Sequence, residues 1–337
     1  SDNLVSNEIE FQKILPALTD RHASGGVYLG VGPEQNFTYI AALKPRIAFI
    51  LDIRAENRGL HLLYKALFEL SRDRAEFVSL LFSRPKLASV NTTSTAAELF
   101  AAVDPAPPTE GQLSANLTRV FDVLRERHHL ALSLRDTDGL RRAYQEFARV
   151  GVLASYSSSR APGRYNTYAD LMNASDATGQ PASYLANEAR FQVVKDLEAR
   201  NLIVPVVGDF SGPIALRAIG EWLRAHQATV SVFYLSNVED YLAGEAGASF
   251  CRNVATLPID DGSEFIRSSG TGTILHGSLP PPSQGPILHS IQHTRSLPTF
   301  TDVIPNPAPT FLNFSASRGS GLFIRTSRIV AEIAACR

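Results

Sequence analysis

Two stretches decide the fold: VYLGVGPEQN at residues 27–36 and IAFILDI at residues 47–53. Each holds a short apolar run without alternation, which is typical of strands buried on both faces in a helix-covered parallel sheet. Residues 37–44 and 63–70 carry apolar side chains at helical spacing. The first 70 residues therefore predict a strand–helix–strand–helix unit of an α/β protein.

The strand signal is absent between residues 71 and 200, where helical periodicity and loops remain, and it returns at residues 202–207 and 230–235. We therefore expect a doubly wound, mostly parallel α/β sheet with a helical insertion between its second and third strands. In this interpretation residues 1–70 and 201–337 form one discontinuous domain, and residues 71–200 form the insertion. Short strand-like pieces follow, at residues 253–257, 265–267, 287–291 and 322–324.

Composition excludes several classes of protein. The 337 residues include 32 Lys and Arg against 33 Asp and Glu, and this near-zero charge argues against nucleic acid as the main partner. No run of 18 apolar residues is present, so the sequence predicts no membrane span. Cys251 and Cys336 are too few for a disulfide framework or a four-thiolate zinc site, which leaves either one bridge or two unlinked thiols. The oligomeric state is not predictable from these features.

The turn after the first strand carries candidate ligand-binding residues. Gly30 and Gly32 would let a ligand approach the backbone, and Gln35 and Asn36 lie in the first turn of the next helix, whose free N–H groups attract anions. Asp52 ends the second strand, where an acid can accept hydrogen bonds from ribose hydroxyls. Gln35 occupies the third glycine position of the dinucleotide motif, which disfavours NAD. The alternative is a tight structural turn with Asp52 as a helix cap.

Further polar residues follow the third and fourth strands. Asp209 comes after residues 202–207, and Asn237 and Glu239 come after residues 230–235. Since the carboxyl ends of parallel strands share one sheet edge, we expect a small molecule to bind at that edge. The structural alternatives are a helix cap for Asp209 and the start of a short helix for Asn237 and Glu239.

Residues 27–52 resemble the first two motifs of class I S-adenosylmethionine-dependent methyltransferases, which have a Rossmann-like fold. The resemblance implies S-adenosylmethionine held by the glycine turn and Asp52, with Asp209 near adenine. It also implies that Asn237 or Glu239 orients a methyl acceptor, which the sequence does not identify. Tyr28 and Glu34 depart from the family, at the position of an acid and of a third glycine respectively, and no Asn-Pro-Pro-Tyr tetrad follows the fourth strand.

The whole chain is also similar to a group of uncharacterised bacterial proteins that share the phrases GVGPEQNF and YLSNVE, some with export signals. The competing hypothesis is thus a non-catalytic binding or interaction module that keeps the fold without the cofactor. A methyltransferase would be cytoplasmic, whereas a signal peptide removed before Ser1 would indicate export. A third hypothesis is a metal-dependent hydrolase using Asp52, Asp209 and Glu239.

No metal ligand set is predicted. His289 and His293 have the spacing of two ligands on one helix face, but they lack the adjacent Glu of the metalloprotease motif and lie among prolines.

Overall fold

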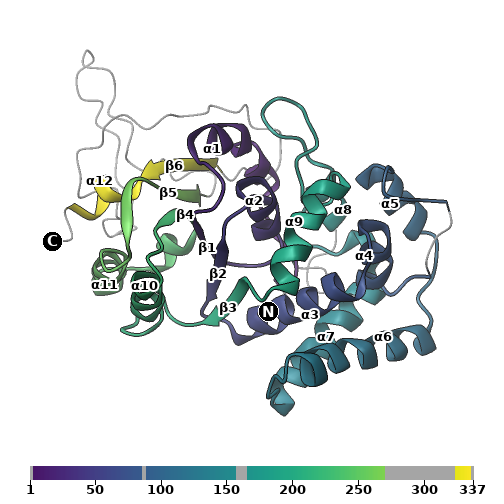
Figure 1. Cartoon of the computed structure of the whole chain (residues 1–337). Helices are drawn as coiled ribbons and strands as arrows, with labels where there is room; N and C mark the ends of the chain where they lie inside the picture. The colour runs from purple at the N-terminus through teal and green to yellow at the C-terminus, as the bar shows by residue number, and fades with distance from the viewer. Residues whose placement is uncertain (1–2, 86–88, 157–164, 270–322, 335–337) are drawn as a thin grey trace, which may run out of the picture. The chain divides into compact units, whose positions relative to one another are not determined.

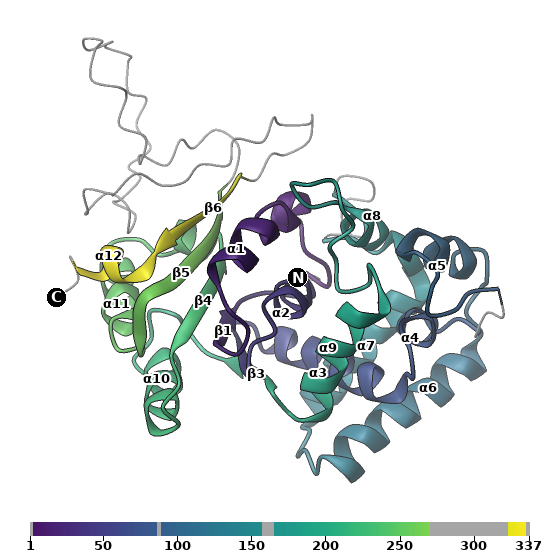
Figure 2. The same ribbon diagram turned by 45° about the horizontal axis from the view of Figure 1, so that its top comes forward.

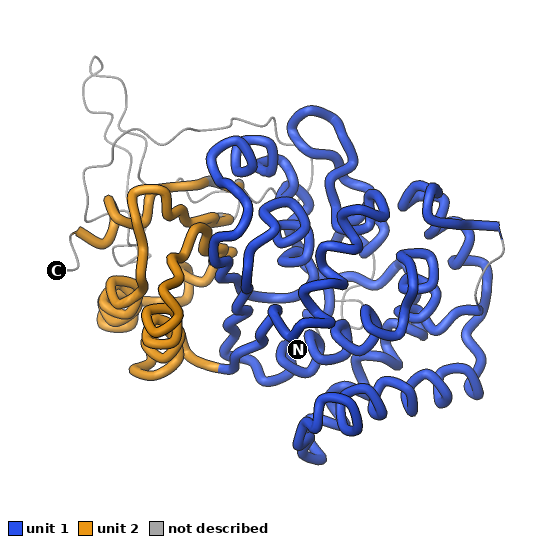
Figure 3. Tube along the Cα trace, in the orientation of Figure 1, with its two compact units in different colours: residues 1–207 blue, residues 208–337 orange. Residues whose placement is uncertain are grey.

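The computed structural model describes residues 3–85, 89–156, 165–269 and 323–334. It divides into two compact units, residues 1–207 and residues 208–337 (Figure 3). Both units contain strands and helices. Within the units the strands pair mostly in parallel. The prediction of a mostly parallel α/β protein is therefore confirmed. The prediction of one discontinuous domain with a helical insertion stays a prediction.

The first unit contains three parallel strands in the order β3-β2-β1. Every residue of β1 and β2 is buried, as the unbroken apolar runs predict. The register places Gly30 beside Ile50 and Asp52 beside Val207, so the turn after β1 and the end of β2 lie at the same edge of this part of the sheet. The three strands are β1 (Val27–Gly30), β2 (Ile47–Asp52) and β3 (Ile203–Val207).

The helices of the first unit surround an aromatic cluster centred on Phe37. Its ring lies 5.1–5.5 Å, centroid to centroid, from the rings of Tyr64, Phe68, Tyr184 and His61. In Figures 1 and 2, α3, α6 and α7 run beside one another, and they are in contact. The helices are η1 (Ile9–Gln12), α1 (Leu15–Arg21), α2 (Gln35–Leu43), α3 (Ala55–Leu70), α4 (Arg74–Leu81), α5 (Ala96–Val103), α6 (Glu110–Asp122), η2 (Val123–Arg127), α7 (Leu134–Val150), η3 (Gly151–Leu153), α8 (Tyr168–Asn173) and α9 (Glu188–Ala199).

The second unit pairs β4 (Val230–Ser236) in parallel with β5 (Ile259–Ser269), and β5 pairs antiparallel with β6 (Phe323–Arg328). An antiparallel edge strand on an otherwise parallel sheet is common in α/β proteins. The unit also contains α10 (Ala215–Ala225), η4 (Val238–Tyr241), α11 (Glu245–Val254) and α12 (Ile329–Ile333).

One predicted element is wrong. Residues 253–257 end α11 and form the turn after it, because a short apolar run fits a buried helix end as well as a strand. Residues 287–291, His289 and His293 lie outside the described residues. Cys251 is half of a disulfide, and the other cysteine of the sequence, Cys336, is outside the described residues too. Among the described helices, none has the length and apolar character needed to cross a bilayer.

Candidate functional site

Asn36, on the first turn of α2, closes the glycine turn from inside. Its side-chain N–H₂ donates to the carbonyl oxygens of Val31 at 2.9 Å, Gly32 at 3.2 Å and Pro33 at 2.8 Å. Its amide oxygen accepts a hydrogen bond of 2.9 Å from the Tyr28 hydroxyl. The Asn36 side chain is therefore committed to the turn itself, and it is fully buried.

The two glycines are required by contacts inside the chain. A Cβ added at Gly30 would lie 2.0 Å from Oδ1 of Asn36 and 2.8 Å from Cε1 of Tyr28. Gly32 has φ +79°, which side-chain-bearing residues rarely adopt, and a Cβ there would lie 3.0 Å from Nε2 of Gln35. The space over both glycines is thus taken by side chains of the same turn.

Glu34 and His61 flank the turn, and both are buried. The backbone N–H of Ser6 donates to the Glu34 carboxyl oxygens at 3.0 and 3.2 Å, and burial raises the pKa of Glu34 to about 8. His61 Nε2 lies 2.9 Å from the carbonyl oxygen of Gly32. Because a carbonyl only accepts, Nε2 carries the proton, and burial lowers the pKa of His61 to about 4. Both groups favour their neutral forms.

Asp52 ends β2 at the expected position, but Arg54 occupies its carboxylate. The Arg54 side chain donates through Nε to Oδ1 at 3.1 Å and through Nη2 to Oδ2 at 2.8 Å. The backbone N–H of Arg54 donates to Oδ1 at 2.9 Å. Asp52 is only 4% exposed, so little of it is accessible to a ligand in this arrangement.

The three predicted site residues of the second unit follow strands along the chain: Asp209 comes two residues after β3, and Asn237 and Glu239 come after β4. Asp209 is exposed and accepts from the N–H and hydroxyl of Ser211, both at 2.8 Å, so it shapes a turn. Asn237 precedes η4 and is half-buried. Ser236, which ends β4, has the left-handed φ of 52°.

Glu239 belongs to a buried ion-pair cluster in the second unit. Arg267, 2% exposed, donates to both carboxylate oxygens of Glu239 and to both of Glu332, with distances to Glu332 of 2.9 and 2.5 Å. These carboxylates raise the pKa of Arg267 although burial opposes it. The cluster links η4 and α12 to β5. Because Arg267 holds both carboxylate oxygens of Glu239, that carboxylate is poorly placed to take a proton from a substrate.

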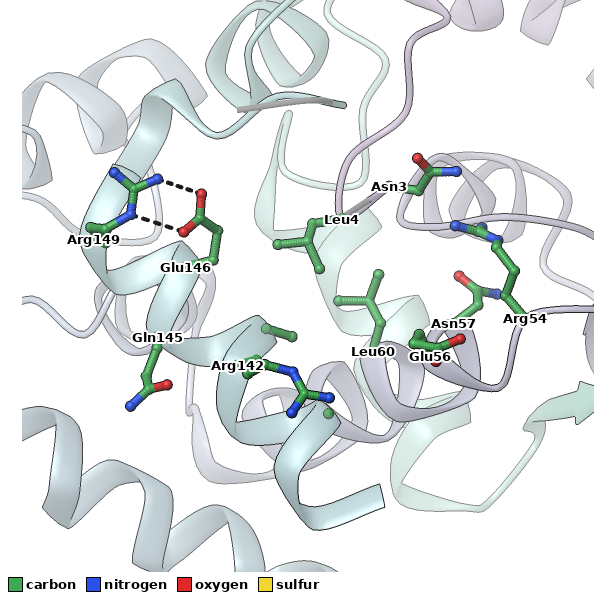
Figure 4. A pocket seen from close by; sticks show the side chains of 12 residues that line it. Asn3, Leu4, Arg54, Glu56, Asn57, Leu60, Arg142, Gln145, Glu146 and Arg149 are labelled. Atoms are coloured by element: carbon green, nitrogen blue, oxygen red, sulfur yellow. Dashed lines mark hydrogen bonds and ion pairs between the residues drawn. The ribbon is translucent and has the colours of Figure 1, made fainter. Parts of the chain in front are cut away.

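The first unit contains a pocket of about 380 Å³ that the sequence analysis does not anticipate. It lies among α3, α7 and the first described residues of the chain (Figure 4). Arg54, which also holds Asp52, lines this pocket together with Asn57 and Arg142. Asn57 and Arg142 are 85 positions apart, so no local spacing signals that they share a cavity.

Two further observations concern metals and S-adenosylmethionine. Among the described residues, no group of three or more His, Cys, Asp or Glu side chains is placed to hold a metal ion. In this arrangement Arg54 occupies the Asp52 carboxylate that S-adenosylmethionine would need, and Asn36 and Gln35 lie at the Cβ positions of the two glycines.

A protein-family model matches most of the chain. The model of a family described as Domain of unknown function (DUF7790) matches residues 3–299. Among curated proteins, nothing matches significantly. Among solved structures, the chain matches the rRNA methyltransferase AviRa from Streptomyces viridochromogenes with 11% identity and a TM-score of 0.34, covering 96% of this chain and 84% of the other. A TM-score this low assigns neither fold nor activity.

Proposed function

The chain belongs to the DUF7790 family, and we propose that it is a ligand-binding module that keeps a parallel α/β framework without using S-adenosylmethionine. The observation that carries this proposal is the Asn36 side chain, which fills the glycine turn and bonds to three of its carbonyls. A cofactor that lies against glycines needs their Cα atoms open to the ligand. Here Oδ1 of Asn36 lies only 2.0 Å from the position that a Cβ at Gly30 would take.

The state of Asp52 supports the same proposal. A ribose would offer hydroxyl donors to this carboxylate, but three N–H groups of Arg54 already satisfy it. Exchanging the bidentate ion pair between Arg54 and Asp52 for hydrogen bonds from neutral hydroxyls is unfavourable unless the ligand supplies further contacts. The glycine turn and Asp52 therefore bond to other groups of the protein rather than to a ligand.

The second candidate is S-adenosylmethionine-dependent methyl transfer, with Asn237 or Glu239 orienting an unidentified acceptor. The register favours it, because Gly30 pairs with Ile50 and Asp52 ends β2 two residues later, at the same edge. The Arg54 side chain is 27% exposed, so it has room to swing away from Asp52. In this candidate Arg54 is a gate that a cofactor must displace.

Calorimetric titration separates the two candidates. We would titrate the full chain with S-adenosylmethionine and S-adenosylhomocysteine, using NAD and ATP as controls, and confirm by thermal unfolding that each sample is folded. The binding module predicts no heat of binding from any of the four compounds, in the wild type and in Arg54→Ala. Micromolar binding of the first two compounds, lost in Asp52→Ala, would overturn it in favour of the methyltransferase. Binding by Arg54→Ala alone would do so too, and would identify Arg54 as the gate.

A further inference from the structure

The pocket between α3 and α7 has an apolar floor. Leu4 and Leu60 lie near its centre (Figure 4). The small residues Gly139 and Ala143 on α7 also line it. No atom lies within 4 Å of a Cβ built at Gly139, so the wall is open there. A cavity of about 380 Å³ with such a floor is large enough for a small organic molecule with a short apolar part.

The two acids that line the pocket are already neutralised by arginines. Glu146 pairs with Arg149 through two hydrogen bonds, of 2.9 and 2.6 Å. Glu56 accepts a 3.0 Å hydrogen bond from Arg135, and a backbone hydrogen bond followed by this ion pair lowers the pKa of Glu56. Because each acid already has a cationic partner, neither leaves a charge for the ligand to balance.

Of the three arginines that line the pocket, two are paired with acids. Arg54 is held by Asp52, as described above, and Arg149 by Glu146. Arg142 lines the same pocket and has no hydrogen-bond or ion-pair partner among the described residues. Its guanidinium fork matches a carboxylate, which accepts two parallel hydrogen bonds from it.

Asn57 adds a second requirement for the ligand. It lines the pocket, is 97% buried, and its side-chain oxygen has no hydrogen-bond partner in the described part of the chain. A buried amide oxygen without a donor is costly, by about 1–3 kcal/mol, and a ligand N–H or O–H would remove that cost. Figure 4 shows Asn57 and Arg54 on one side of the pocket, with Glu146 and Arg149 across from them.

From these groups we infer that the pocket binds a small monocarboxylic acid that also carries an N–H or O–H donor and a short apolar part. The carboxylate pairs with Arg142, the donor bonds to Asn57, and the apolar part lies on Leu4 and Leu60. This inference deepens the proposed function by giving the binding module a ligand class. It uses none of the glycine-turn residues, so its failure is distinguishable from S-adenosylmethionine binding.

The test uses N-acetyl-L-leucine, which has all three features, and N-acetyl-L-leucinamide, in which a neutral carboxamide replaces the carboxylate. Binding of each to the full chain would be measured by ligand-observed NMR titration. We expect the acid to bind at least tenfold more tightly than the amide, and Arg142→Gln to abolish that preference. Equal affinity for the two compounds, or no binding of the acid at 10 mM, would overturn the inference.

Two matched controls keep this test interpretable. Arg141→Gln removes the neighbouring cation on α7, which lies over the Phe121 ring and does not line the pocket, so it should leave the acid's affinity unchanged. Gly139→Leu fills the open wall and should abolish binding, whereas Gly111→Leu on α6, where a Cβ also meets no atom, should not. If Arg141→Gln weakens binding as much as Arg142→Gln, the pocket is not the site.

Discussion

Arg54 binds both carboxylate oxygens of Asp52, through Nε at 3.1 Å and Nη2 at 2.8 Å. Asp52 ends β2, and Arg54 is the residue immediately before α3. The pair therefore joins the end of a central strand to the start of the helix that follows. It also places a guanidinium over the carboxylate that a ribose-binding role would need.

We predict that Arg54→Ala lowers the free energy of unfolding by about 2 kcal/mol, because it strands a buried carboxylate without its charged partner. Urea denaturation measures this change. The control is Arg135→Ala, whose ion pair with Glu56 is mostly exposed and should cost less than about 1 kcal/mol. Equal losses in the two variants would contradict the prediction.

Gly30→Ala should lower the free energy of unfolding by about 3 kcal/mol or more, because its Cβ would lie 2.0 Å from Oδ1 of Asn36. Gly111→Ala, in the first turn of α6 with open space around its Cβ position, should not destabilise the protein and should stabilise it by less than about 1 kcal/mol. In the double variant Gly30→Ala, Asn36→Ala the two costs should sum to more than the measured loss, since one clash is removed. Additive costs would show that the clash is not with Asn36.

Stability should fall as the pH rises from about 4.5 to about 8. Glu34 and Glu198 are buried carboxyls whose pKa values are raised to about 8 by desolvation, so the folded state holds their protons longer than the unfolded chain does. Their contribution is complete below pH 4.5 and is lost as the pH passes the folded-state pKa. Glu34→Gln and Glu198→Gln should each flatten the profile in part, as urea denaturation at several pH values would show. An unchanged slope in both variants would contradict this.

His61 should act in the opposite sense. Its pKa is lowered to about 4 by burial, so the unfolded chain binds a proton first and stability is lost as the pH falls from 6.5 to 4. An NMR pH titration of the histidine ring protons should show one histidine, His61, that is still neutral at pH 5. A His61 resonance that titrates near pH 6.5 would refute the burial argument.

Arg267→Ala should lower the free energy of unfolding by about 3–5 kcal/mol, because it leaves Glu239 and Glu332 without their shared buried cation. Chemical denaturation of the full chain, followed by far-UV circular dichroism, measures this loss. Arg252→Ala, whose partner Glu245 is 81% exposed, provides the control and should change stability by less than about 1 kcal/mol. A loss of less than about 1 kcal/mol in Arg267→Ala would contradict the prediction, and it would mean that Glu239 does not depend on Arg267.

The sequence was sufficient to predict β1 to β4, whereas of the 11 residues of β5 only residues 265–267 were predicted. Residues 27–29 and 47–51 are apolar without alternation, and such a run is stable only when both faces of a strand are covered. The helices that follow each strand were equally legible, because their apolar side chains repeat at the helical period. Residues 253–257 were mispredicted, since a five-residue apolar run has no period of its own.

The residue types at the strand ends were also evident, but their partners were not. The sequence determined that glycines follow β1 and that Asp52 ends β2, because strand length and burial are properties of the local pattern. Only the tertiary structure decided that Asn36 fills the turn, that Arg54 covers Asp52, and that Arg142 lines the same pocket as Asn57. The first two contacts join residues two to five positions apart, but the direction that each side chain takes depends on the packing around it. The third relationship joins two helices far apart in the sequence, and no local spacing encodes it.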